Sequence, residues 1–169
     1  MTPSEIEALF DHVYWIRDRI LAAAADPSVP LVDLSPPTRR DLRATLVHEL
    51  DVEWSWRVRL AGPDRTAFAA DDEELVAADF PDVASIRARW AIDEPDMRAW
   101  LGSLAAADLD GPCRTEATGE GHPFWFHLQH LYSHAIQQFA DAATILTAAG
   151  RSPGELDFLD FVESTDRRA

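Results

Sequence analysis

The chain has 169 residues, of which 47% are hydrophobic, and this is enough for one domain with its own core, which we expect to span residues 1–169. The formal net charge of −15 would repel a phosphate backbone, so we expect no nucleic-acid partner and no submicromolar binding to duplex DNA at physiological salt. No apolar run approaches the roughly 20 residues of a membrane span, so we expect a soluble protein without a membrane partner. The lone cysteine, Cys113, cannot form an internal disulfide, which fits the reducing cytoplasm where we expect the protein.

The first predicted helix begins near the N-terminus and extends to about residue 24. Thr2 is suited to the N-cap position, Pro3 to the first turn, and Glu5 completes a capping box with Thr2. Apolar residues then recur at spacings of three and four, which indicates one buried face: Ile6, Leu9, Phe10, Val13, Ile16 and Ile20.

Two further helices are predicted in the middle of the chain. Thr38 and Asp41 offer a cap for the second, which we expect to end at Gly62–Pro63. The third extends over residues 82–106, and Pro95 is expected to kink or split it. The connection at 63–81 is long enough to run the length of a helix, which favours parallel second and third helices.

The fourth long helix is predicted from about His122 to Ala149, and a short amphipathic piece follows around residues 156–162. Four long amphipathic segments in a chain of this size predict an all-α fold, a four-helix bundle with a long connection between helices two and three. Facing helices of such a bundle can build a site in its interior.

Three of the six histidines of the chain fall within residues 127–138 of the fourth helix. At 100° per residue, His127, His130 and His134 fall within an arc of about 80°. His130 and His134 are four residues apart, the spacing at which two imidazoles converge on one ion. Because two ligands are seldom enough, a third donor is needed, a histidine or a carboxylate from another helix, and the second helix offers His48, Asp51 and Glu53.

Other interpretations of these residues remain open. A histidine pair at this spacing also arises by chance, and a buried histidine is more often a hydrogen-bonded core residue than a ligand. His127 fits a role beside the ligands or in a pocket wall, whereas His12 and His122 are expected at the surface or at a cap. The acidic residues of the second helix, Glu49, Asp51 and Glu53, most simply form a solvated face, although one of them could orient a ligating imidazole. The tryptophans are more often core or groove residues than a dedicated site: Trp54, Trp56, Trp90, Trp100 and Trp125.

The order of these residues resembles the DinB/YfiT-like family of metalloenzymes, the DinB superfamily. The resemblance consists of His48, then Glu53 and Trp56 at +5 and +8, and "QHLYSHAIQ" at 129–137. The late-helix pattern of the family reads approximately N-H-x-x-x-H-R-G-Q, which His130, His134 and Gln137 match. Gln129 stands in place of the Asn, and Ala135–Ile136 in place of Arg-Gly, so a role of the Arg-Gly pair is not implied here.

The resemblance implies a four-helix bundle of the DinB/YfiT-like type and a divalent ion, zinc or nickel, held by His48, His130 and His134. Three neutral imidazoles leave a position open for water or substrate. The family includes S-transferases that use low-molecular-weight thiols such as mycothiol or bacillithiol, and this activity is the functional expectation. A metal-dependent hydrolase and a non-catalytic metal- or ligand-binding bundle are the alternatives. We expect a small-molecule substrate, a thiol cosubstrate and a homodimer, and we assign no catalytic residue.

Overall fold

Helices dominate the structure, a computed structural model that describes residues 1–33, 36–62, 74–113 and 121–166. Four of them are long: α1 (Pro3–Ala24), α2 (Leu42–Leu60), α3 (Val83–Gly102) and α5 (Phe124–Ala148). The smaller elements are the 3-10 helix η1 (Ala77–Asp79), α4 (Ala106–Leu109), α6 (Phe158–Asp166) and the two-residue strands β1 (Pro112–Cys113) and β2 (His122–Pro123). The predicted all-α class is confirmed. Among the described residues, no helix has the length and apolar character that crossing a membrane requires.

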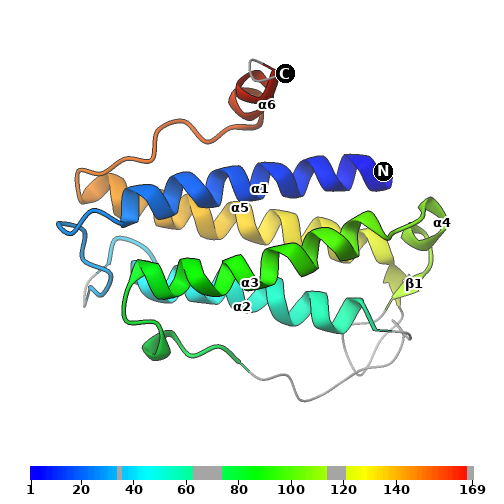
Figure 1. The fold of residues 1–169 in the computed structure, drawn as a ribbon, viewed down its shortest axis with the longest axis horizontal. Helices are drawn as coiled ribbons and strands as arrows, with labels where there is room; N and C mark the ends of the chain where they lie inside the picture. The colour runs from blue at the N-terminus through cyan, green and yellow to red at the C-terminus, as the bar shows by residue number, and fades with distance from the viewer. Residues whose placement is uncertain (34–35, 63–73, 114–120, 167–169) are drawn as a thin grey trace.

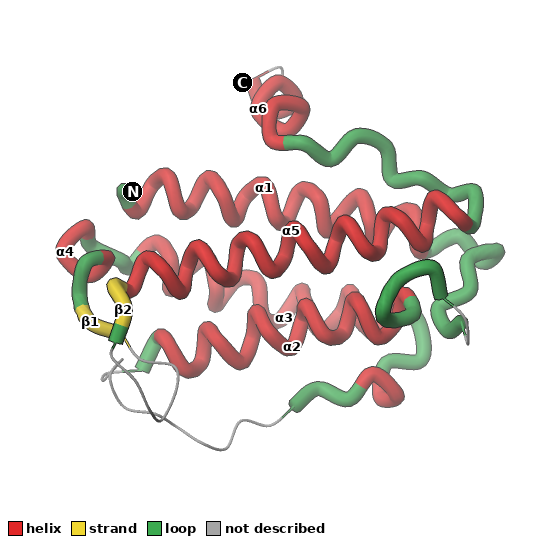
Figure 2. The backbone as a smooth tube through the Cα atoms, turned by 180° about the vertical axis from the view of Figure 1, so that it is seen from behind, coloured by secondary structure: helices red, strands yellow, loops and turns green. Residues whose placement is uncertain are grey.

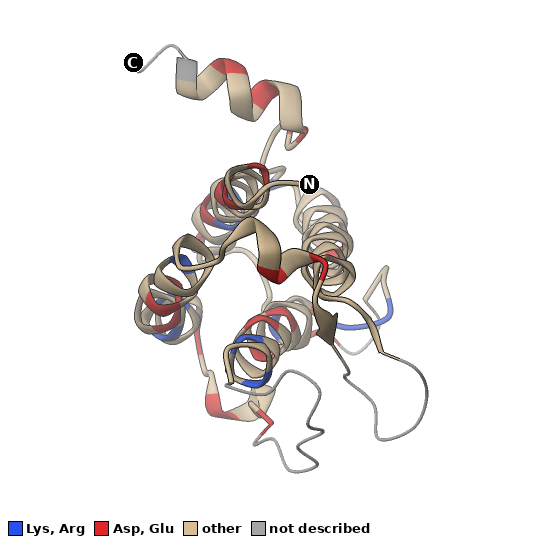
Figure 3. Ribbon diagram, turned by 90° about the vertical axis from the view of Figure 1, so that its right-hand side faces the viewer, with Lys and Arg blue, Asp and Glu red and all other residues tan. Residues whose placement is uncertain are grey.

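The four long helices lie side by side around a common core. Viewed along their axes, they occupy the corners of a square, in which α1 and α2 each contact both α3 and α5 (Figure 3). Figure 1 shows that α2 and α3 run in the same direction and that α1 and α5 run in the opposite one. The parallel pair agrees with the length of the connection between these helices, of which residues 63–73 lie outside the described part of the chain.

Local sequence signals account for the helix starts. The predicted capping box of α1 is present, with the Glu5 amide donating to the Thr2 hydroxyl and the Thr2 amide to the Glu5 carboxylate. Asp41 caps α2 by accepting from the amide of Ala44 at 2.8 Å. Helix α3 passes through Pro95 without being split, and its ribbon bends near the middle (Figure 1).

Three predicted boundaries are wrong by a few residues. Helix α3, predicted over residues 82–106, ends at Gly102 and is followed by the separate short helix α4. Helix α2 ends at Leu60, short of Gly62, while Pro63 lies outside the described residues. Helix α5 begins at Phe124 because the residues before it are extended and pair with β1, Pro112 opposite Pro123 and Cys113 opposite His122. This pairing leaves Cys113 fully buried beside the first turn of α5.

The apolar core consists of two clusters along the bundle. One contains residues from the C-terminal half of α1, the first half of α2 and the second half of α5. The other contains the N-terminal half of α1, the end of α3 and the first half of α5. Trp90 belongs to the first cluster and Trp100 to the second, so both are core residues, as the sequence suggested. Two polar residues of α2 are also buried, Glu49 and Glu53.

His12 is buried, with 3% of its surface exposed, so its prediction as a surface or capping residue is wrong. The reason is that the C-terminal segment, which is far from His12 in the sequence, covers this side chain. Helix α6 lies outside the four long helices, against α1 (Figure 1). The Nε2–H of His12 donates to the carbonyl oxygen of Leu156 at 3.0 Å, and its ring lies against Phe158 and Phe161, with centroids 5.2 and 5.4 Å away. His12 therefore anchors the C-terminal segment.

We expect the substitution His12→Ala to loosen α6 while leaving the four long helices folded. The loss of a buried hydrogen bond and two ring contacts should cost about 1–3 kcal/mol locally, which corresponds to roughly tenfold or faster amide exchange in residues 158–165. Hydrogen exchange measured by mass spectrometry would show this change. The exposed His122 provides the control, since His122→Ala should leave exchange in α6 unchanged. Equal protection of α6 in both variants would contradict the anchoring role of His12.

Candidate metal centre

The three histidines predicted as ligands come together between α2 and α5. These two helices pack against each other, and their course is seen in Figure 2. His48 projects from α2, and His130 and His134 project from successive turns of α5. The ring centroid of His134 lies 5.1 Å from that of His48 and 6.0 Å from that of His130. His134 is therefore the central member, and the set spans two helices that are far apart in the sequence.

The environment of these histidines favours the neutral imidazole, which is the form that binds metals. Burial lowers the pKa of His48, His130 and His134. The positive charge of Arg40 lowers the pKa of His48 and His134 further. A set of neutral imidazoles is a chemically suitable donor set for zinc or nickel, so these residues fit the ion that the resemblance implies.

The imidazole nitrogens are not yet in a ligating arrangement. Within the described ranges, the only group of three or more His, Cys, Asp or Glu side chains whose potential ligand atoms lie within 4.8 Å of one another is Glu155, Asp157 and Asp160. Ligation of one ion by the three histidines therefore requires a side-chain rotation. His130 is the exposed member and has room to rotate, whereas the side chain of His134 is only 15% exposed.

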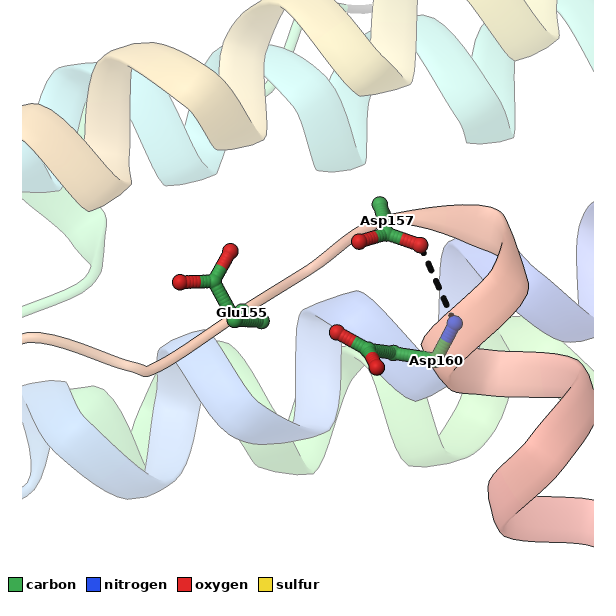
Figure 4. A group of neighbouring side chains, drawn as sticks. All are labelled: Glu155, Asp157 and Asp160. Carbon is green, nitrogen blue, oxygen red and sulfur yellow. Dashed lines mark hydrogen bonds between the residues drawn. The ribbon is translucent and has the colours of Figure 1, made fainter.

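The acidic group at the start of α6 has a simpler explanation than metal binding. All three carboxylates are exposed (Figure 4). Asp157 accepts hydrogen bonds from the amides of Leu159 and Asp160, at 2.8 and 3.0 Å, which satisfies the free amides at the start of the helix. Exposed acidic groups of this kind are common without an ion. We assign Asp157 to helix capping.

Glu49 is buried beside the histidines, although the simplest interpretation of the sequence places it on a solvated face. It is 2% exposed, and its Oε2 lies 2.7 Å from Nδ1 of His134. The prediction of a solvated acidic face is therefore wrong for Glu49, because α2 is covered by α3 and α5. The other interpretation, that one acidic residue orients a ligating imidazole, fits this contact. Asp51 is half-buried and accepts from the amide of Leu75 at 2.8 Å.

Glu53, one turn after Glu49, is also buried rather than solvated. The hydroxyl of Tyr14 on α1 donates to Oε1 of Glu53 at 3.0 Å. Burial, with the neighbouring Glu49, raises the pKa of Glu53 to about 8, although Tyr14 and the charge of Arg17 act in the opposite direction. Glu53 is therefore mostly protonated at pH 7, which suits a carboxyl group in the interior of the bundle.

Trp56 is the tryptophan that borders the histidines. Its ring centroid lies 4.9 Å from that of His130 and 5.9 Å from that of His127. His127 is buried, and its Nε2–H donates to the carbonyl oxygen of Cys113 at 3.4 Å, which agrees with a role in the wall of the site. Two other tryptophans contact different partners, Trp54 the guanidinium of Arg89 and Trp125 the ring of Phe126.

Comparison of the chain with models of known protein families gives no match, and comparison with curated proteins also gives none. The case for a metal centre therefore rests on the residues themselves. Their strongest feature is the contact of His134 with a histidine of another helix and with a buried carboxyl group.

Proposed function

We propose that the chain is a divalent-metal-dependent enzyme in which His48, His130 and His134 hold zinc or nickel, on a four-helix bundle of the DinB/YfiT-like type. The observation that carries the proposal is the position of His134. It lies between the other two imidazoles and at hydrogen-bond distance from the buried carboxyl of Glu49. Metal-binding histidines usually have such a partner on their second nitrogen, whereas a chance histidine pair on a helix does not require one.

The reaction we propose is the transfer of a low-molecular-weight thiol, of the mycothiol or bacillithiol type, to an electrophilic small molecule. An ion held by three neutral imidazoles has an open position, at which it would favour the thiolate over the thiol. Trp56 offers an apolar wall next to His130 for the electrophile. The positive charge of Arg40, which acts on His48 and His134, favours an anionic group beside them.

Peptide hydrolysis is less well supported by the same residues. His48 is followed by Glu49, but position 52 is Val, so the H-E-x-x-H pattern of zinc peptidases is absent. The carboxyl of Glu49 contacts His134 through Oε2, which suits a partner of that imidazole better than a base for peptide hydrolysis.

The proposal predicts thiol-dependent turnover of an electrophile. Zinc- or nickel-loaded protein should conjugate monochlorobimane with mycothiol, bacillithiol or glutathione, and His48→Ala should reduce the rate at least about 100-fold by removing a ligand. The measurement is bimane fluorescence with and without each thiol. Hydrolytic turnover that needs no thiol and disappears in His48→Ala would contradict the transferase proposal. It would leave the proposal of a metal site in place. No turnover with any thiol would favour a non-catalytic metal- or ligand-binding bundle.

A further inference from the structure

We infer that Phe126 and Trp56 form a binding surface for a flat, conjugated small molecule beside the three histidines. For its reaction the inference rests on the proposed function, and it names the class of the electrophile, an aromatic or otherwise conjugated molecule. It also gives a task to Phe126, whose position the packing of the core does not explain. Phe126 belongs to neither apolar core cluster, and 47% of its surface is exposed.

Phe126 and Trp56 border His130 from two different helices. Phe126 lies one turn before His130 on α5, and side chains four residues apart are neighbours on the surface of a helix. Trp56 is on α2, and its ring centroid lies 4.9 Å from that of His130. The two helices run in opposite directions (Figure 1), so residues that follow His48 on α2 lie beside residues that precede His134 on α5. Both aromatic rings therefore lie on the same side of the three histidines, toward the start of α5.

A continuous row of ring contacts joins Phe126 to the histidines. The ring of Phe126 is stacked on that of His122, with centroids 5.6 Å apart and an angle of 7° between the planes. His127 follows, with its centroid 6.4 Å from that of His122 and 5.9 Å from that of Trp56. His122 and His130 are exposed and Trp56 is half-buried, so part of this row is open to solvent. Because aromatic rings gain from offset stacking in addition to the burial of their area, such a row favours a flat molecule over an aliphatic one.

The binding surface adjoins the place where the proposed transfer would occur. A flat molecule on Phe126 and Trp56 would have its reactive carbon near His130, in reach of a thiolate at the site. In the transfer, the thiolate sulfur forms a bond to the carbon that carries the leaving group, and the leaving group departs with the electron pair of the broken bond. The proton of the thiol passes to water when the thiolate forms. Stacking of the flat body would hold the carbon in position for this attack.

The first test measures the binding of an unreactive flat probe, syn-(methyl,methyl)bimane, to the metal-free protein. In an NMR titration of the wild type, the probe should shift the side-chain resonances of Phe126 and Trp56. The dissociation constant should rise about three- to tenfold in Phe126→Ala, because one stacking partner is lost. Phe158→Ala is the matched control. Its ring is also exposed, over 37% of its surface, but lies on α6, so the constant should stay within about twofold of the wild type. Absence of shifts at Phe126, or equal affinity in Phe126→Ala, would overturn the inference.

The second test compares two electrophiles in the thiol assay of the metal-loaded protein. Monochlorobimane has a flat conjugated body, and iodoacetamide has none. The ratio of kcat/KM for monochlorobimane to that for iodoacetamide should fall about three- to tenfold in Phe126→Ala, through a higher KM for monochlorobimane. Phe158→Ala should keep the ratio of the wild type. A wild-type ratio in Phe126→Ala would contradict the role of Phe126 in the choice of substrate.

The outcomes separate this inference from the proposed function. Binding of the bimane probe at Phe126 and Trp56 without thiol-dependent turnover would contradict the proposed transfer and leave the binding surface in place. Thiol-dependent turnover with an unchanged preference in Phe126→Ala would contradict the binding surface and leave the proposed transfer in place.

Discussion

Replacing His130 and His134 together by alanine should lower the content of zinc or nickel from about one ion per chain to near zero. Both ligands supplied by α5 are removed, and the single imidazole of His48 cannot retain a divalent ion against buffer and water. The measurement is elemental analysis of protein purified without a chelating tag, after reconstitution with each metal and removal of the excess. Each single substitution should leave a weaker site, with the larger loss for His134 because it is the central and less exposed member.

The matched control for the double variant uses the same spacing on the same helix. Gln129 and Ser133 are four residues apart, and each immediately precedes a predicted ligand. The double substitution Gln129→Ala and Ser133→Ala should leave the metal content at the wild-type level. Near-zero metal in the reconstituted wild type, or undiminished affinity in the His130 and His134 variant, would end the metal-site hypothesis.

Features that depend on neighbouring residues could be predicted from the sequence. The capping box of Thr2 and Glu5 involves residues three apart, and the pairing of His130 with His134 follows from the period of a helix. The position of His48 against His134 is different, because no local pattern specifies how α2 faces α5. The resemblance supplied that expectation, and the 5.1 Å between their rings agrees with it.

The misplaced residues are those whose burial is decided by distant parts of the chain. Polar residues occur on several sides of α2, so its sequence does not reveal which arc faces inward, and Glu49 and Glu53 could not be separated from a solvated face. His12 is covered by a segment that begins 144 residues later at Leu156. In each case a polar side chain in the interior found a specific hydrogen-bond partner, which composition and periodicity do not reveal.

Because of Glu53, the free energy of unfolding should fall as the pH rises. In the folded protein the pKa of Glu53 is about 8, against an ordinary value of 4.5. Between these two values the folded state binds a proton that the unfolded state has released, so the free energy of unfolding falls by about 1.4 kcal/mol for each pH unit. The stabilising contribution is thus complete below about pH 4.5 and lost as the pH rises through about 8.

Glu53→Gln should remove this dependence, because the amide is uncharged at every pH and its oxygen can still accept from Tyr14. The melting temperature of the metal-free variant should equal that of the wild type near pH 5 and exceed it by about 8–15 °C at pH 8.5. The buried histidines, whose lowered pKa values reduce stability at acidic pH, are the same in both proteins, so their effect cancels in the comparison. The exposed Glu7 provides the control, since Glu7→Gln should change the melting temperature by less than about 2 °C at either pH. A difference between wild type and Glu53→Gln that does not grow with pH would mean that Glu53 is ionised in the folded protein, and that the interior of the bundle accommodates its charge.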